Sequence, residues 1–136
     1  MIVLASLPEL TDRVRAHQPD RRLCPLRLED APRMRRALER SKCSGQAALA
    51  ADAFAYHYIW TTTLPYWWME RDGTFFLFAH SPDGWFMPIP PLGPGPFDAV
   101  VREGLADLYR WNRGAPVSRI ENMTDQQKAR LTGGEL

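Results

Sequence analysis

Apolar and polar positions alternate over residues 65–88 in a way that is typical of short β-strands separated by tight turns. Asp72 and Gly73 favour a two-residue hairpin loop, because both central positions of such a loop need positive φ. A second turn follows, with Pro82 at its second position and Gly84 at its fourth. The pattern predicts strands over about 65–71, 74–80 and 85–88.

A two-residue loop also fixes the register of the first two strands. The predicted pairs are Arg71 with Thr74, Met69 with Phe76, and Trp67 with Phe78. The opposite face carries a second apolar set, Trp68, Phe75 and Leu77. Because both faces are apolar, we expect an α+β fold in which helices cover both sides of the sheet.

Apolar residues at helical spacing predict helices on either side of these strands. The expected helices cover residues 3–18, about 31–41, 46–61, 97–112 and 125–131, with short strands over 25–28 and 117–120. The 46–61 helix is rich in alanine and aromatic residues, and we expect it to be mostly buried. Gly114 is expected to end the 97–112 helix. Thr124 and Gln127 match a capping box for the last helix.

Composition fits one globular domain, with 136 residues, 45% apolar and 24% charged positions. A net charge of +1 gives no general attraction to nucleic acid, and the basic residues over 33–42 fit a solvated helix face best. Two cysteines without metal-site spacing favour a reduced cytoplasmic location. The longest apolar stretch, 47–60, is interrupted by Asp52 and His57 and is shorter than a membrane span of about 20 residues. Any membrane contact is therefore expected to be peripheral.

A Gly/Pro segment lies where a strand is expected to lead into the 97–112 helix. Gly93 and Gly95 occupy the kind of junction at which phosphates bind helix N-termini, as in acetyl-CoA-dependent acetyltransferases. Pro94 and Pro96 have no N–H, so the segment offers few donors to a phosphate. Both a phosphate loop and a rigid turn fit the residues, and the rigid turn fits better.

The polar run Ser118-Arg119-Ile120-Glu121-Asn122 follows, at the end of a short expected strand. Strand alternation places Arg119 and Glu121 on one side, where they would form an ion pair with another strand or line a cleft. Glu121 is the best available carboxylate for a general base, and Asn122 follows it in the turn.

Histidines and tryptophans add no clear site. His17, His57 and His80 are far apart and lack the spacing of metal ligands. Tryptophans such as Trp60 are more often core residues than platforms for ligands. We therefore predict no metal, no cofactor and no catalytic residue from spacing alone. The candidate binding residues are Trp60, Gly93, Gly95, Arg119, Glu121 and Asn122.

Several short motifs in order resemble the bacterial DUF2156 family, whose relatives form the C-terminal domain of phosphatidylglycerol lysyltransferases. These motifs are Leu26-Arg27-Leu28-Glu29-Asp30, the Phe54 to Trp60 helix, Pro91-Leu92-Gly93, and Ser118 to Asn122. The resemblance covers about residues 23–136 and leaves 1–22 as an N-terminal helical extension. It extends only to the first of the two halves of the family's domain.

The resemblance implies a GNAT-like fold with a mixed, mostly antiparallel sheet between helices. In full-length relatives, two such halves transfer an aminoacyl group from aminoacyl-tRNA to a phospholipid. The resemblance therefore implies a half-domain that needs a second GNAT-like half as partner and is inactive alone. Two other functions stay open: a small acyl-CoA acyltransferase, and a non-catalytic module that self-associates through aromatic residues.

Overall fold

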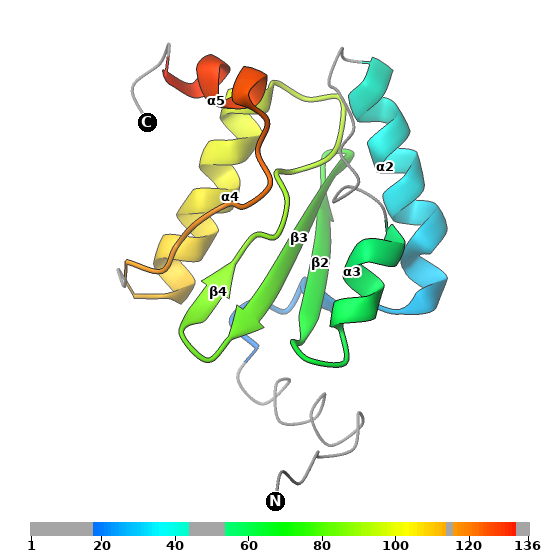
Figure 1. The fold of residues 1–136 in the computed structure, drawn as a ribbon, viewed down its shortest axis with the longest axis vertical. Helices are drawn as coiled ribbons and strands as arrows, with labels where there is room; N and C mark the ends of the chain where they lie inside the picture. The colour runs from blue at the N-terminus through cyan, green and yellow to red at the C-terminus, as the bar shows by residue number, and fades with distance from the viewer. Residues whose placement is uncertain (1–17, 44–53, 114–115, 133–136) are drawn as a thin grey trace, which may run out of the picture.

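A computed structural model of the chain describes residues 18–43, 54–113 and 116–132. These residues form an α+β fold around a four-stranded antiparallel sheet in the order β1-β2-β3-β4 (Figure 1). The strands are β1 Cys24–Pro25, β2 Tyr66–Arg71, β3 Thr74–Ser81 and β4 Gly84–Phe86. The helices are the 3-10 helix η1 Leu28–Asp30, α2 Ala31–Cys43, α3 Phe54–Trp60, α4 Phe97–Trp111 and α5 Asp125–Thr132. The expected 3–18 helix, part of the expected 46–61 helix and Gly114 lie outside the described residues.

The β2–β3 hairpin forms as the sequence predicts. Asp72 and Gly73 have φ angles of 51° and 80°, the positive values that a two-residue loop needs. The predicted register is confirmed, with pairs Arg71–Thr74, Met69–Phe76 and Trp67–Phe78. One local turn therefore decides which side chains of both strands share a face.

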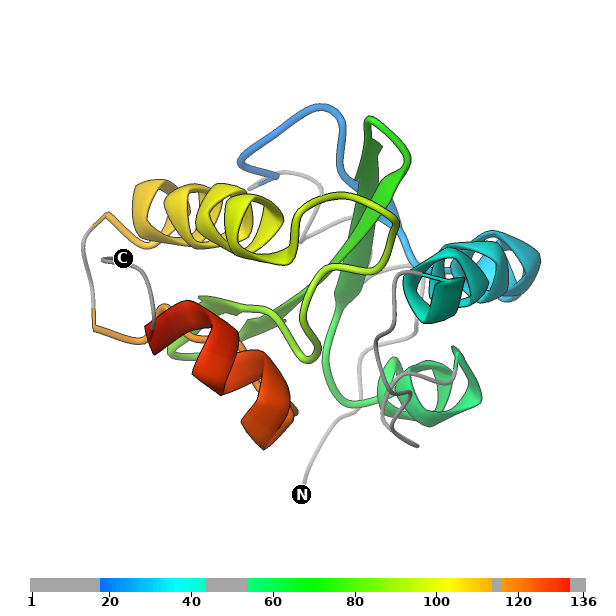
Figure 2. The ribbon, with the colours of Figure 1, turned by 90° about the horizontal axis from the view of Figure 1, so that it is seen from above.

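Strand β3 divides its side chains between two hydrophobic clusters. Phe75, Leu77 and Ala79 belong to one cluster, and Phe76 and Phe78 to the other; all five are 0% exposed. The first cluster includes side chains from α2 and the second includes side chains from α4. Figure 2 shows the sheet running between α2 and α4.

Helices α4 and α5 lie close to their predicted bounds. Arg113, at φ 53°, takes the left-handed conformation just after α4, one position before the glycine expected to do so. The capping box of α5 is confirmed: the Thr124 N–H donates to Gln127 Oε1 at 2.9 Å, and the Gln127 N–H donates to Thr124 Oγ1 at 3.0 Å.

The strand expected over 25–28 is shorter than predicted. Leu26 still donates its N–H to the Tyr66 carbonyl at 2.9 Å, but the next residues turn into η1. The Asp30 carboxylate accepts the Arg27 N–H at 2.8 Å, and the Asp30 N–H bonds to the Arg27 carbonyl at 3.0 Å. This local pairing removes Arg27 from the sheet and places Leu28 in a helix.

The strand expected over 117–120 is reduced to one parallel bridge between Met87 and Ile120. The Met87 N–H donates to the Arg119 carbonyl at 3.0 Å, and the Glu121 N–H donates to the Met87 carbonyl at 2.9 Å. The chain then bends at residues 88–89 and at Asn122, so the ladder stops there.

The prediction that the 46–61 helix is mostly buried is wrong for its described part. His57 is the buried residue of α3, at 0% exposure, while four large side chains face solvent. These are Tyr56, Tyr58, Ile59 and Trp60, at 44%, 38%, 68% and 48% exposure. Only one narrow face of this short helix packs on the sheet, although its apolar composition suggests more.

The described helices are all too short or too polar to cross a lipid bilayer.

Candidate functional site

The Gly/Pro junction before α4 is a closed turn. The Gly93 N–H donates to the buried Ser41 hydroxyl of α2 at 2.6 Å. A Cβ atom at Gly93 would lie 3.0 Å from the Gly73 carbonyl oxygen, so the two backbone segments pack directly on each other. Pro94 and Pro96 have no N–H to give. Gly95 is thus the one residue of 93–96 whose N–H could still meet a phosphate, which supports the rigid-turn interpretation.

The segment after the parallel bridge holds a local ion pair. Arg119 Nε lies 2.9 Å from Glu121 Oε1, with side chains 46% and 43% exposed. The predicted pairing with another strand is wrong, because each residue is the other's partner. The Arg119 guanidinium also lies 4.3 Å from the centre of the Phe86 ring, which holds the pair over the edge of β4. The ion pair with Arg119 therefore accounts for Glu121 at this place.

Asn122 has a structural role in the same segment. Its φ is 58°, and its side-chain Nδ2 donates to the Pro88 carbonyl at 2.9 Å. Asparagine tolerates the left-handed conformation better than most residues. Asn122 therefore ends the bridged segment and gives the Pro88 carbonyl a hydrogen-bond donor.

Trp60 stands at the end of α3 and is 48% exposed, unlike the core tryptophans Trp67 and Trp85. Tyr56 and Ile59 lie on neighbouring helical positions and are also exposed, and we call these three residues the α3 stripe. The stripe is an exposed, largely apolar surface at the end of α3.

The structure does not gather the candidate residues into one site. The loop at 93–95 lies near the β2–β3 turn, in contact with Thr74 and α2. The 119–122 segment contacts β4, and α3 ends toward the opposite end of the sheet from the loop (Figure 1). The candidates therefore occupy three separate places in the fold.

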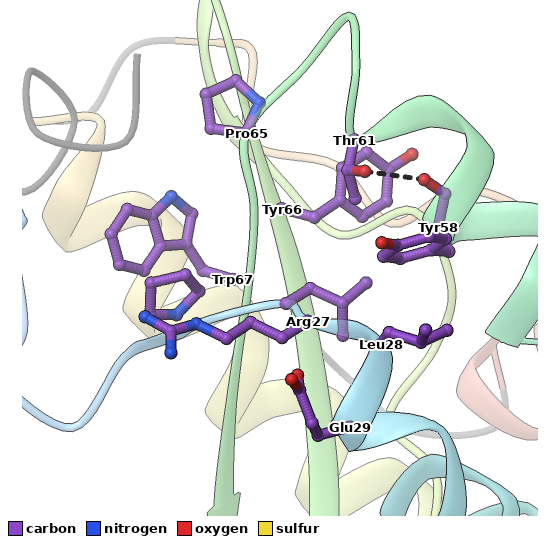
Figure 3. A pocket seen from close by; sticks show the side chains of 10 residues that line it. Arg27, Leu28, Glu29, Tyr58, Thr61, Pro65, Tyr66 and Trp67 are labelled. Carbon is purple, nitrogen blue, oxygen red and sulfur yellow. Dashed lines mark hydrogen bonds between the residues drawn. The ribbon is translucent and has the colours of Figure 1, made fainter. Parts of the chain in front are cut away.

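A pocket that the sequence did not reveal lies at the edge of β2, with a volume of about 430 Å³. Its walls come from residues 25–29, from Tyr58 and Thr61 at the end of α3, and from residues 65–67. Figure 3 shows Arg27 reaching to one side, Leu28 and Tyr58 on the other, and the Glu29 carboxylate pointing between them. Three separate chain segments form these walls, and no local pattern predicts that they meet.

Tyr66, which lines this pocket, stays protonated at neutral pH. Burial raises its pKa to about 12, and the nearby Tyr56 and Glu121 add to the shift in the same direction. The hydroxyl therefore contributes no charge to the pocket and cannot act as a base near pH 7.

Comparisons with protein-family models, curated proteins and solved structures find no match for this chain. Within the described ranges, no three His, Cys, Asp or Glu side chains are grouped as metal ligands. Function must therefore be inferred from the geometry and from the motifs of the sequence.

Proposed function

We propose that this chain is the first GNAT-like half of a DUF2156-type transferase and that it shapes one wall of a cleft without carrying out the transfer. In full-length members of the family it resembles, the two halves together move an aminoacyl group from aminoacyl-tRNA to a phospholipid. In this proposal, helices flank both faces of the sheet, as in the GNAT fold, and a second half supplies the reacting groups.

The order and direction of the elements support the fold part of the proposal. After the antiparallel strands β2 to β4, the chain crosses over through α4 and returns in parallel at the Met87–Ile120 bridge. Clusters on the two sides of β3 include residues of α2 and of α4 respectively. A GNAT-like half needs this combination of a meander, a helix crossover and a parallel return.

The shortage of free N–H donors at the β4–α4 junction supports the functional part of the proposal. Acetyl-CoA-dependent enzymes of this fold bind a pyrophosphate with backbone N–H groups at this junction. Here the Gly93 N–H already donates to the Ser41 hydroxyl, and Pro94 and Pro96 have no N–H. A chain that resembles a transferase but lacks this cradle is better suited to a supporting wall than to acyl-CoA catalysis.

The direct test offers the purified chain charged lysyl-tRNA together with vesicles containing phosphatidylglycerol. We expect no aminoacylated lipid above a control without protein. Transfer above that control would overturn the proposal. A parallel titration with acetyl-CoA by calorimetry should show no saturable heat, and saturable binding would favour the acyltransferase alternative.

The α3 stripe favours a second candidate function, self-association of a non-catalytic module. Contiguous exposed aromatic residues commonly mark contact surfaces. Sedimentation over a wide concentration range should then show a dimer that Ile59→Ser weakens. Tyr109→Ser is the matched control, because Tyr109 is 54% exposed but lies on α4. A monomer at every concentration would exclude this function.

A further inference from the structure

The pocket beside β2 has the features of a small-molecule site. Its volume of about 430 Å³ lies within the usual range of ligand pockets, which is roughly 300–1,000 Å³. Most of its lining is apolar or aromatic, with leucine, proline, tyrosine and tryptophan side chains. Leu28 is 62% exposed, so the protein itself leaves this apolar side chain uncovered.

Hydrogen bonds to backbone carbonyls fix the walls before any ligand arrives. On one wall, the Leu26 N–H donates to the Tyr66 carbonyl at 2.9 Å. On another, the Thr61 hydroxyl donates to the Tyr58 carbonyl at 2.6 Å, a contact drawn in Figure 3. A ligand would therefore lose little free energy in ordering the site.

Two opposite charges, Arg27 and Glu29, line the pocket without neutralising each other. Both side chains are exposed, and neither forms an ion pair with any residue in the described part of the chain. Arg22 and Arg119 are also exposed, but each has an acidic partner, Asp20 and Glu121 respectively.

We propose that this pocket binds a small zwitterion with an apolar body, of which a free α-amino acid with an aromatic or large aliphatic side chain is the simplest. Arg27 takes the carboxylate, since guanidinium binds carboxylates through two parallel hydrogen bonds. Glu29 takes the ammonium group. Leu28 and Tyr58 cover the apolar side chain. This assignment goes beyond the transferase proposal and stands or falls independently of it.

The test is an amide NMR titration of the full chain with three related compounds. L-phenylalanine carries both charges, 3-phenylpropionate lacks the amine, and 2-phenylethylamine lacks the carboxylate. We expect L-phenylalanine to shift the amides of residues 26–29 and 58–67 and to saturate. The two single-charge compounds should bind about tenfold more weakly, the loss expected for one charge-assisted contact.

Two variants connect each charge to its group on the ligand. Arg27→Gln should weaken L-phenylalanine about tenfold and leave 2-phenylethylamine unchanged, because that compound has no carboxylate. Glu29→Gln should weaken L-phenylalanine and leave 3-phenylpropionate unchanged. Arg21→Gln is the matched control, since Arg21 is an exposed arginine outside the pocket. Both charged sites are on the surface, so thermal unfolding should confirm intact variants.

Three results would overturn the assignment. Equal binding of all three compounds would show an apolar pocket without charge recognition. Shifts confined to amides away from the pocket would place the ligand elsewhere. Absence of saturable shifts with L-phenylalanine would show that the pocket does not take a zwitterion of this kind.

Discussion

At the scale of single residues, Asp107 is a buried polar side chain that links α4 to the sheet. It is almost fully buried and lies 2.6 Å from Arg71 Nη2 of β2 and 2.6 Å from Arg110 Nη2 of its own helix. Arg71 in turn stacks on Phe76, with its guanidinium 4.4 Å from the ring centre. A buried carboxylate therefore anchors the end of β2 to the middle of α4.

Asp107→Asn should destabilise the protein by about 2–4 kcal/mol, because it leaves the largely buried Arg71 without its close counter-charge. Glu103→Gln is the matched control: Glu103 lies on the same helix, 3.8 Å from the same arginine, but is 50% exposed. It should cost less than about 1 kcal/mol. Urea unfolding gives both values, and equal losses would contradict the anchoring role of Asp107.

Tyr66 makes stability depend on pH in the alkaline range. Its pKa is about 12 in the folded protein and about 10 in an unfolded chain. Between these values the unfolded state loses the proton and the folded state keeps it, so stability falls as pH rises from 10 to 12. Tyr66→Phe has no proton to lose. The unfolding free energy of the wild type relative to this variant should therefore decrease across that interval, and a constant difference would refute the shift.

At the scale of elements, a feature can be predicted when residues close together in the sequence determine it. The two-residue loop at Asp72 and Gly73 sets the β2–β3 register by itself, and the spacing of apolar residues defines α4. The 117–120 segment ends where its partner segment bends at residues 88–89, and the exposure of α3 depends on which other segments pack against it. Neither partner is visible from the local pattern.

The apolar face of α4 is a stability element that the sequence identifies correctly. Leu108 is 0% exposed in the cluster that it shares with β3. Leu108→Ala should cost about 2–5 kcal/mol. The neighbouring Tyr109 is 54% exposed, and Tyr109→Ala should change stability by less than about 0.5 kcal/mol. Chemical denaturation followed by circular dichroism measures both, and similar losses would invalidate the assigned face.

The candidate sites show the same division between local and distant causes. The sequence correctly indicated that prolines weaken a phosphate cradle at the 93–95 loop, because proline's missing N–H is a local property. The sequence could not reveal that the Gly93 N–H already donates to the Ser41 hydroxyl of α2. The pocket cannot be predicted from the sequence for a related reason. Arg27 and Glu29 line a pocket only because folding brings Tyr58 and Tyr66 close to them.

At the scale of the whole molecule, β3 joins the two clusters into one cooperative unit. Its alternating side chains lie in both clusters, so we expect a loss of packing on one side of the sheet to disturb the other. We expect tryptophan fluorescence and far-ultraviolet circular dichroism to report one coincident urea transition. Phe75→Leu and Phe76→Leu, one in each cluster, should shift both probes together. Separate midpoints would show that the clusters unfold independently.

The parallel bridge at Met87 and Ile120 has a consequence for local opening. Two backbone hydrogen bonds hold it before the chain bends at residues 88–89, whereas the β2–β3 ladder is continuous over six residue pairs. The chain from 116 to 122 can therefore detach in a small fluctuation that leaves the meander folded. In native-state hydrogen exchange, the Glu121 amide should exchange through this opening at low denaturant. The amides of the β2–β3 ladder should exchange only when the whole molecule unfolds.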